Sequence, residues 1–227
     1  MPLKFAIKLM VLAILIFVFS NREYVHPKVL VALLWPLVYL LVETILAMAA
    51  AMARAMVGLE LEPNFNEPYL STSLQDFWVN RWNLAVRRIM RPAVYDPILR
   101  FWTPLVGSKW AQIPAIVGSF LVVGLVHELV YYYVARVPPT WEVAWFFVLH
   151  GMCLTAEIGL KRALATDTWR MPRVVSVPLT VGFVMVTGVW LFFPQMIRCN
   201  FDVRLMQEYV ALVGLLRKVS QRLPFFS

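Results

Sequence analysis

Residues 174–197 form an apolar run without a single charged side chain, and no other feature constrains the fold as strongly. A run of this length can cross the ~30 Å hydrocarbon core of a bilayer as an α-helix. Over all 227 residues, 61% are hydrophobic and 15% are charged, whereas soluble domains are roughly half apolar and a quarter charged. A soluble fold of this size cannot bury that excess, so the sequence predicts an integral membrane protein.

Four more apolar runs predict further membrane-spanning helices. The first, at residues 9–19, follows basic residues as a signal peptide would, but no A-x-A-like cleavage site comes after it. We therefore expect a retained span that starts near Phe5, with Lys8 snorkelling to the membrane surface. The predicted fold class is all-α, a polytopic membrane bundle of about five spans. The other runs are 29–59, 111–134 and 141–160.

The second run, at residues 29–59, is unusually long and contains an acidic residue. One helix of that length measures about 46 Å, so it must either tilt and project from the membrane or bend at Pro36. Glu43 lies well inside the run. A carboxylate there makes a hydrogen bond between helices or faces a polar cavity, and the sequence leaves both readings open.

Residues 60–110 differ from the rest because charged and turn-forming residues return. Within this region, residues 74–90 carry apolar side chains at helical spacing, which predicts an amphipathic helix at the membrane interface. Ser73 and Asp76 have the spacing of a helix N-cap pair. The apolar face comprises Leu74, Phe77, Trp78, Trp82, Ala85, Val86, Ile89 and Met90, and the basic face comprises Arg81, Arg87, Arg88 and Arg91.

The pattern divides the chain into four parts: N-terminal spans at 1–59, a cytosolic or interfacial segment at 60–110, a three-span core at 111–197, and an amphipathic tail at 198–227. With five spans, the N-terminus and the loops 60–110 and 161–173 lie on one side of the membrane. That side carries 12 Lys and Arg against 8 on the other, which favours a cytosolic location for it.

The net charge of +8 is explained by basic residues at the ends of spans, so we expect no nucleic-acid partner. Cys153 and Cys199 lie in apolar surroundings without metal-ligand spacing, and we interpret them as buried thiols. An H-E-x-x-H zinc pattern is absent because Tyr131 stands where the second histidine would be. The sequence therefore predicts no metal site.

Two histidines fall inside predicted spans, where ionisable residues are costly and often functional. His127 shares a helix face with Tyr131, four residues later, and is followed by Glu128. Because Glu128 is rotated about 100° from His127, we expect it to pair with another helix or a loop arginine. His127 is either a general base or a structural hydrogen-bonding group. His150 is either a polar wall of the same site or structural.

Three motifs make the sequence recognisable. Residues 77–83 read F-W-V-N-R-W-N, residues 127–133 read H-E-L-V-Y-Y-Y, and residues 146–151 read F-F-V-L-H-G. Over residues 60–220 the chain resembles the wax synthase branch of the membrane-bound O-acyltransferases. These plant-type enzymes transfer fatty acyl groups to long-chain alcohols, and their close relatives acylate sterols.

The resemblance implies an acyl-CoA-dependent O-acyltransferase in which Asn83 and His127 form the active site. Its partners would be fatty acyl-CoA, a long-chain alcohol or sterol, and the bilayer of the endoplasmic reticulum, with homo- or hetero-oligomers left open. Acyl-CoA would be a co-substrate, and no other cofactor is expected. The residues expected around the chamber are Trp82, Glu128, Tyr131 and His150, and those available to the phosphates of CoA, or alternatively to lipid headgroups, are Arg81, Arg87, Arg88 and Arg91.

The chain departs from the family in length and at Val79, where a glycine is common. Only two apolar regions precede the F-W-x-x-x-W-N motif, so we expect the N-terminal half of the family to be shortened here. One alternative function is that of an inactive paralogue which acts as the partner of a full-length acyltransferase. Another is a small proton-coupled transporter or channel that uses Glu43, His127 and Glu128.

Overall fold

The computed structural model describes residues 2–58, 62–164, 171–199 and 214. Within these residues every regular element is helical, and five helical stretches are long and apolar enough to cross a membrane. The predicted all-α, five-span architecture is therefore confirmed. The amphipathic tail predicted for 198–227 lies almost entirely outside the described residues. The five stretches are Leu3–Ser20, Pro27–Val57, Leu84–Ala135, Glu142–Leu164 and Arg173–Arg198.

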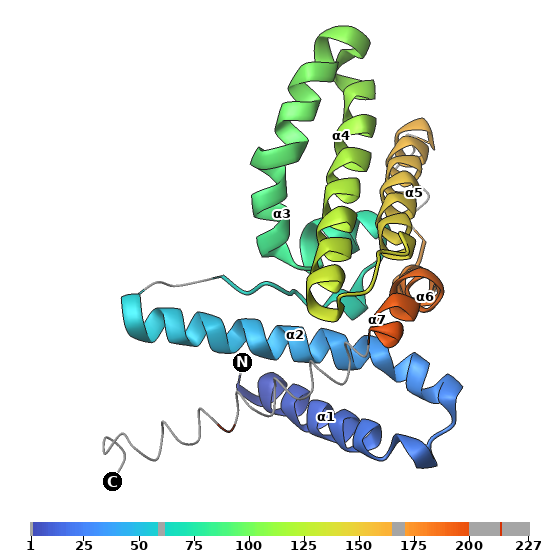
Figure 1. Ribbon diagram of the computed structural model, residues 1–227. Coiled ribbons are helices and arrows are strands. Elements are labelled where there is room, and N and C mark those ends of the chain that lie inside the picture. The colour runs from blue at the N-terminus through green and yellow to red at the C-terminus, as the bar shows by residue number, and fades with distance from the viewer. Residues whose placement is uncertain (1, 59–61, 165–170, 200–213, 215–227) are drawn as a thin grey trace.

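The first two helices run antiparallel at one side of the molecule (Figure 1). Helix α1 (Pro2–Ser20) leads through the 3-10 turn η1 (Arg22–Tyr24) into α2 (Pro27–Val57). Pro36 lies inside α2, which remains a single helix over its 31 residues. Helix α2 ends at Gly58, whose φ of 70° is the left-handed conformation that glycine adopts at little cost.

An ion pair joins α1 to α2. The Lys8 Nζ atom lies 2.6 Å from Glu43 Oε1 and also donates a 3.1 Å hydrogen bond to the Tyr39 hydroxyl. This pairing lowers the cost of a charge in an apolar region, and the snorkelling of Lys8 to the membrane surface stays a prediction. Of the two readings left open for Glu43, the contact between helices is the one observed.

The segment that was predicted to be one amphipathic helix is broken in two. It contains the π-helical turn η3 (Asp76–Arg81) and α3 (Leu84–Met90), with Asn83 between them at φ 42° and ψ 62°. A left-handed residue interrupts a right-handed helix, so the continuous-helix prediction is wrong. The chain reaches η3 through the 3-10 turn η2 (Pro68–Leu70), and it leaves α3 through a second π-helical turn, η4 (Arg91–Tyr95).

The next element, α4 (Asp96–Ala135), is a helical hairpin rather than a single rod. It reverses at Gly107, which has a φ of 79° and a ψ of 156°, and its two arms lie side by side (Figure 1). The two arms are in close contact at Gly118. A Cβ atom added there would lie only 2.6 Å from the Ile98 side chain of the other arm. The turn residues of this region therefore do not form a loop: Pro97 and Pro104 are both part of the helix.

Helix α5 (Glu142–Leu164) packs along the second arm of α4 through small residues. A Cβ atom added to Gly124 would lie 2.9 Å from the Ala144 Cα atom, and one added to Gly151 would lie 3.0 Å from Phe120 Cβ. Only glycine permits this close approach, which fixes the second arm of α4 against α5.

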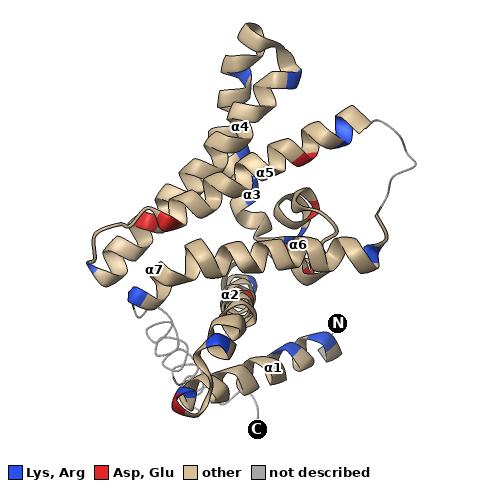
Figure 2. Cartoon of the chain, turned by 90° about the vertical axis from the view of Figure 1, so that its right-hand side faces the viewer, with Lys and Arg blue, Asp and Glu red and all other residues tan. Residues whose placement is uncertain are grey.

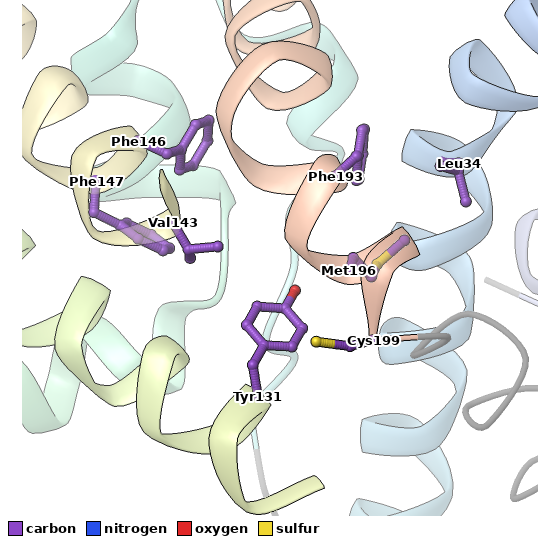
Figure 3. Packing of buried hydrophobic residues seen from close by; sticks show 8 residues of the cluster. All are labelled: Leu34, Tyr131, Val143, Phe146, Phe147, Phe193, Met196 and Cys199. Carbon is purple, nitrogen blue, oxygen red and sulfur yellow. The ribbon is translucent and has the colours of Figure 1, made fainter. Parts of the chain in front are cut away.

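The last described helices complete the core. Helix α6 (Arg173–Thr187) continues through the π-helical turn η5 (Gly188–Phe192) into α7 (Phe193–Arg198). Side chains from α2, α4, α5 and α7, together with Cys199, meet in one buried cluster (Figure 3). Of the two predicted buried thiols, Cys199 is buried and Cys153 is half-buried. The cluster contains Leu34, Tyr131, Val143, Phe146, Phe147, Phe193, Met196 and Cys199.

Candidate active site

A cavity of about 650 Å³ lies between these helices. Its walls are mostly apolar side chains from α2, η3, α3, α4, α5, η5 and α7. Three arginines line it and no acidic residue does, so among the described residues its charged lining is entirely positive. Asn83 and His127, which lie 44 positions apart in the sequence, both line this cavity.

His127 lies on the second arm of α4 with one ring nitrogen engaged. Its Nδ1 atom lies 2.8 Å from the Val123 carbonyl oxygen. A carbonyl only accepts, so Nδ1 must carry the proton, and in the neutral ring Nε2 then holds the basic lone pair. The hydrogen bonds among the described residues leave Nε2 unengaged. The rings of Phe147 and Phe192, with centroids at 4.7 and 5.8 Å, flank the imidazole.

Asn83 owes its position to the break between η3 and α3. Asparagine tolerates the left-handed region better than most residues, which suits it to this place. Its Oδ1 atom accepts a 3.4 Å hydrogen bond from the Val86 N–H and caps α3. The acceptor of the amide is thus used by the backbone, whereas the Nδ2 donors are not used in any hydrogen bond of the described residues.

Backbone hydrogen bonds from the preceding loop hold Asn83 on both sides. The Leu84 N–H donates to the Asn64 carbonyl at 2.8 Å, and the Asn66 N–H donates to the Arg81 carbonyl at 2.9 Å. The Trp82 N–H closes η3 on the Phe77 carbonyl at 2.8 Å. The loop therefore fixes the backbone around Asn83.

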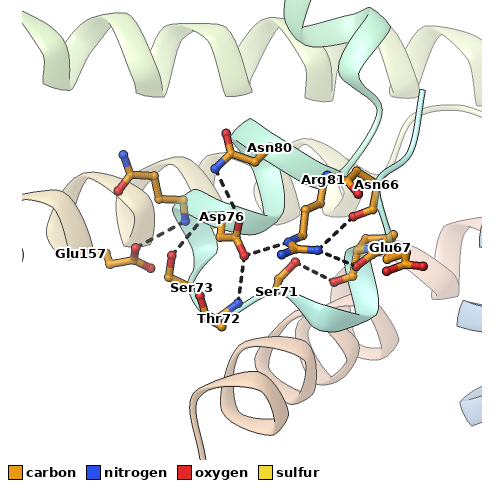
Figure 4. Close-up of polar contacts among 11 residues, drawn as sticks. Asn66, Glu67, Ser71, Thr72, Ser73, Asp76, Asn80, Arg81 and Glu157 are labelled. Carbon is orange, nitrogen blue, oxygen red and sulfur yellow. Dashed lines mark hydrogen bonds and ion pairs between the residues drawn. The ribbon is translucent and has the colours of Figure 1, made fainter. Parts of the chain in front are cut away.

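A network of polar contacts nearby is centred on Asp76 and Arg81 (Figure 4). Arg81 Nε lies 2.8 Å from Asp76 Oδ2, and its Nη1 atom donates to the carbonyls of Asn66 and Glu67. Burial alone would raise the pKa of Asp76, but the hydrogen bond from Arg81, with those from Thr72 and Asn80, lowers it below its usual range. Arg81 does not line the cavity, so the structure does not place it where the predicted phosphate contact requires.

The predicted N-cap pair is confirmed at the start of this segment. Ser73 Oγ accepts from the Asp76 N–H at 3.1 Å, and Asp76 Oδ2 accepts from the Thr72 N–H at 3.2 Å. On the other side, Glu157 of α5 accepts from the Leu74 N–H at 2.8 Å. These contacts tie the segment that carries Asn83 to the helix that packs against α4.

Aromatic rings form one wall of the cavity. Trp82, which was expected around the chamber, is one of them. Its ring stacks on Phe77 at 5.4 Å and meets Trp35 at 4.9 Å. Tyr131 lines the cavity one turn after His127, on the same face of α4. Trp82 and Tyr131 therefore both line the cavity, and their role in a reaction chamber stays a prediction.

Two other residues predicted for the chamber do not line the cavity. His150 is fully buried, with Nδ1 2.8 Å from the Phe146 carbonyl and Nε2 3.3 Å from the Thr187 hydroxyl. Glu128 is also buried and accepts from the Ala144 N–H of α5 at 3.2 Å. Both side chains connect helices, and the expected pairing of Glu128 with another helix is observed.

The four predicted basic residues separate into two groups. Arg87 and Arg91 line the cavity, whereas Arg88 pairs with Glu62 outside it. Arg162, near the end of α5, also lines the cavity and donates a 2.6 Å hydrogen bond to Gln112 Oε1. The sequence interpretation missed Arg162 because a basic pair at 161–162 is typical of the end of a span.

The described residues contain no cluster of three or more His, Cys, Asp or Glu side chains that could hold a metal ion. The polar groups that line the cavity include the imidazole of His127, the amides of Gln75, Asn83 and Gln112, and three guanidinium groups. An imidazole and an amide donor that line the same cavity suit proton removal and the stabilisation of an oxygen that gains negative charge.

Residues 61–149 match the model of the membrane bound O-acyl transferase family. Over these residues the chain is similar to this family. The matched region includes both Asn83 and His127 and ends just before His150. This similarity and the five apolar helices make the protein an integral membrane protein.

Several curated proteins are similar to this chain over most of its length. It is 43% identical to acyl-CoA–sterol O-acyltransferase 1 of Arabidopsis thaliana, over 99% of this chain and 65% of the relative. It is 47% identical to a long-chain-alcohol O-fatty-acyltransferase of Simmondsia chinensis, over 79% of this chain and 51% of the relative. The chain thus spans less than two thirds of the length of these relatives.

Proposed function

We propose that the protein is an O-acyltransferase that moves a fatty acyl group from acyl-CoA to the hydroxyl of a long-chain alcohol or a sterol. The observation that carries this proposal is the meeting of Asn83 and His127 in one apolar cavity. The names of the two relatives described above agree with it. Acyl-CoA serves as co-substrate, without a separate cofactor.

His127 acts as the general base in the proposed reaction. Its Nε2 atom takes the proton of the acceptor hydroxyl as the hydroxyl oxygen attacks the thioester carbonyl carbon. The carbonyl oxygen gains negative charge in the tetrahedral intermediate, and the Nδ2 donor of Asn83 stabilises it. The C–S bond then breaks, and the proton on His127 passes to the departing thiolate. The products are an ester and CoA.

The lining of the cavity suits these substrates. Val126 and Val130 of α4 line it and are 49% and 44% exposed, so the cavity is accessible along this apolar helix. An apolar alcohol or sterol can enter there from the bilayer. At polar positions of the lining, Arg87, Arg91 and Arg162 are available to the phosphates of acyl-CoA.

The two other functions considered from the sequence receive less support. The relatives named above carry enzyme names, which gives no support to a non-catalytic partner role. Glu43 is paired with Lys8 and Glu128 with a backbone N–H, so neither is arranged as a proton carrier beside His127. We place the enzyme in the endoplasmic reticulum on the basis of its family, and the proposal requires no particular oligomeric state.

The test is expression in cells that lack neutral-lipid acyltransferases, fed with fatty alcohols or sterols, with new esters measured in lipid extracts. We expect ester from the wild type and none from His127→Ala. His26→Ala, outside the cavity, serves as the matched control and should retain activity. Absence of ester from a membrane-inserted wild type, or full activity of His127→Ala, would contradict the proposal.

A further inference from the structure

Tyr39 of α2 lies behind the wall of the cavity, next to the segment that carries Asn83. It is 5% exposed and does not line the cavity. Its ring contacts that of Trp82, the residue before Asn83, with a centroid distance of 6.1 Å. It also meets Phe65 edge to face at 5.5 Å, and Phe65 meets Trp82 at 5.1 Å. Tyr39 therefore supports Trp82 both directly and through Phe65.

Phe65 connects Tyr39 to the backbone on both sides of Asn83. It stands between Asn64 and Asn66, the two loop residues whose backbone groups make the hydrogen bonds described above for the Asn83 segment. A shift of the Tyr39 ring thus reaches Asn83 by two routes, through the Trp82 ring and through the loop. The position of an oxyanion donor is critical, since a misplacement of about 1 Å in a reaction centre can lower the rate about 100-fold.

The hydroxyl of Tyr39 is held by a residue of α1. Lys8 Nζ donates to it at 3.1 Å and lies 5.6 Å from the centre of the Tyr39 ring. Glu43, four residues after Tyr39 on the same face of α2, holds the Lys8 Nζ atom at 2.6 Å. Because a buried hydroxyl without a partner is costly, the hydrogen bond from Lys8 holds the ring in one position.

Helix α1 itself lies away from the cavity. In two views α2 lies between α1 on one side and the helices α4 and α5 on the other (Figure 1 and Figure 2). None of the described residues of α1 lines the cavity, and neither does Glu43. Lys8 therefore reaches the candidate reaction centre from outside, through Tyr39.

We propose that Tyr39 and Lys8 are positioning residues for Asn83. The hydrogen bond from Lys8 fixes the Tyr39 ring, the ring fixes Trp82 and Phe65, and these two hold the Asn83 amide where negative charge develops in the reaction. Neither Tyr39 nor Lys8 lines the cavity, so both act through other residues. The inference rests on the proposed function, since it concerns the rate of acyl transfer.

The first test is Tyr39→Phe, which removes the hydroxyl and keeps both the ring and the ion pair between Lys8 and Glu43. With the full chain in nanodiscs, palmitoyl-CoA and a fatty alcohol, we expect kcat to fall about tenfold while KM for palmitoyl-CoA stays the same. Tyr24→Phe, the same change at a residue that is 82% exposed, is the matched control and should retain kcat. An unchanged kcat in Tyr39→Phe, an equal fall in both variants, or a rise in KM alone would overturn the proposal.

A second variant removes the same hydrogen bond from the other side. Lys8→Met/Glu43→Leu keeps Tyr39 intact and leaves no unpaired charge, so the chain should fold and show the same fall in kcat. Lys4→Met removes one charge from α1 a turn earlier. Its ion pair with Glu67 is 75% exposed at the lysine, so this control should change kcat little. Full kcat in the double variant would contradict a positioning role for Lys8.

A third test asks whether the effect passes through Asn83. Groups that act along one path have non-additive effects, so Tyr39→Phe should cause no further fall in kcat when it is added to Asn83→Gly. If the two substitutions instead lowered kcat by independent factors that multiply, Tyr39 would not act through Asn83 and the proposal would be wrong.

Amide hydrogen exchange separates this proposal from the proposed function. In Tyr39→Phe we expect faster exchange of the Trp82 and Leu84 amides than in the wild type, and no change in α5. If the wild type forms no ester, the proposed function fails, while the exchange rates still decide whether Tyr39 holds the Asn83 segment. Equal exchange of these amides in both proteins would refute the positioning role.

Discussion

Lys8 Nζ and Glu43 Oε1 are 2.6 Å apart although both residues belong to helices that qualify as membrane spans. The two side chains remain 23% and 18% exposed, so the pair is largely but not fully buried. Loss of one partner of a buried ion pair leaves an uncompensated charge, whereas replacement of both partners by apolar groups does not.

We therefore expect Lys8→Met alone to lower the free energy of unfolding by about 2 kcal/mol, less than for a fully buried pair because solvent screens part of the charge. The double variant Lys8→Met/Glu43→Leu should recover most of that loss. Thermal unfolding in detergent measures both. If the double variant lost as much free energy of unfolding as the sum of the two single variants Lys8→Met and Glu43→Leu, a direct pair would be contradicted.

Asn83 has two separable roles, one in the backbone and one in the side chain. Glycine adopts a φ of 42° freely but has no amide, so Asn83→Gly should keep the break between η3 and α3. If Nδ2 stabilises the oxyanion, kcat should fall about 100-fold or more. The measurement is ester formation at saturating acyl-CoA, with thermal unfolding to verify the fold. Asn80→Ala, in the same motif but exposed, is the control and should retain kcat.

The contact between Asp76 and Arg81 predicts a pH dependence of stability. The folded-state pKa of Asp76 is lowered, so its charged form stabilises the fold above the ordinary carboxyl value, and this stabilisation is lost as the pH falls through the lowered pKa. Asp76→Asn should remove that part of the acid transition. Unfolding temperatures recorded between neutral pH and about pH 3 test this. If the unfolding temperature of Asp76→Asn fell with decreasing pH as steeply as that of the wild type, another group would be responsible.

The chain reverses at Gly107. The φ and ψ angles of this residue lie in a region that residues other than glycine almost never occupy. Gly107→Ala should cost about 1–3 kcal/mol in stability even though no atom lies near the added methyl group. Gly182→Ala, in the regular part of α6 and equally open, is the comparison and should be neutral or stabilising. Unfolding of both variants in detergent provides the measurement. Equal stability of the two would mean that the hairpin is not strained at this position.

Apolar runs were enough to predict the five spans because a bilayer sets a minimum length for them. The break at Asn83 was hidden, since apolar spacing continues through residues 74–90 as if the helix did too. The resemblance to a family identified Asn83 and His127 as site candidates, but Arg162 could not be found in this way. Its place in the cavity depends on how α5 packs against α4, and no local pattern encodes that packing.

The hairpin of α4 also sets a rule for insertions and deletions. Twenty-four positions separate Asn83 from Gly107, through α3, η4 and the first arm of α4. Twenty positions, or about 30 Å of helix, separate Gly107 from His127 in the returning arm. A single deletion in the returning arm would shift His127 by about 1.5 Å and turn it by about 100° relative to α5. The number of residues on each side of Gly107 therefore specifies the candidate active site as firmly as the side chains themselves.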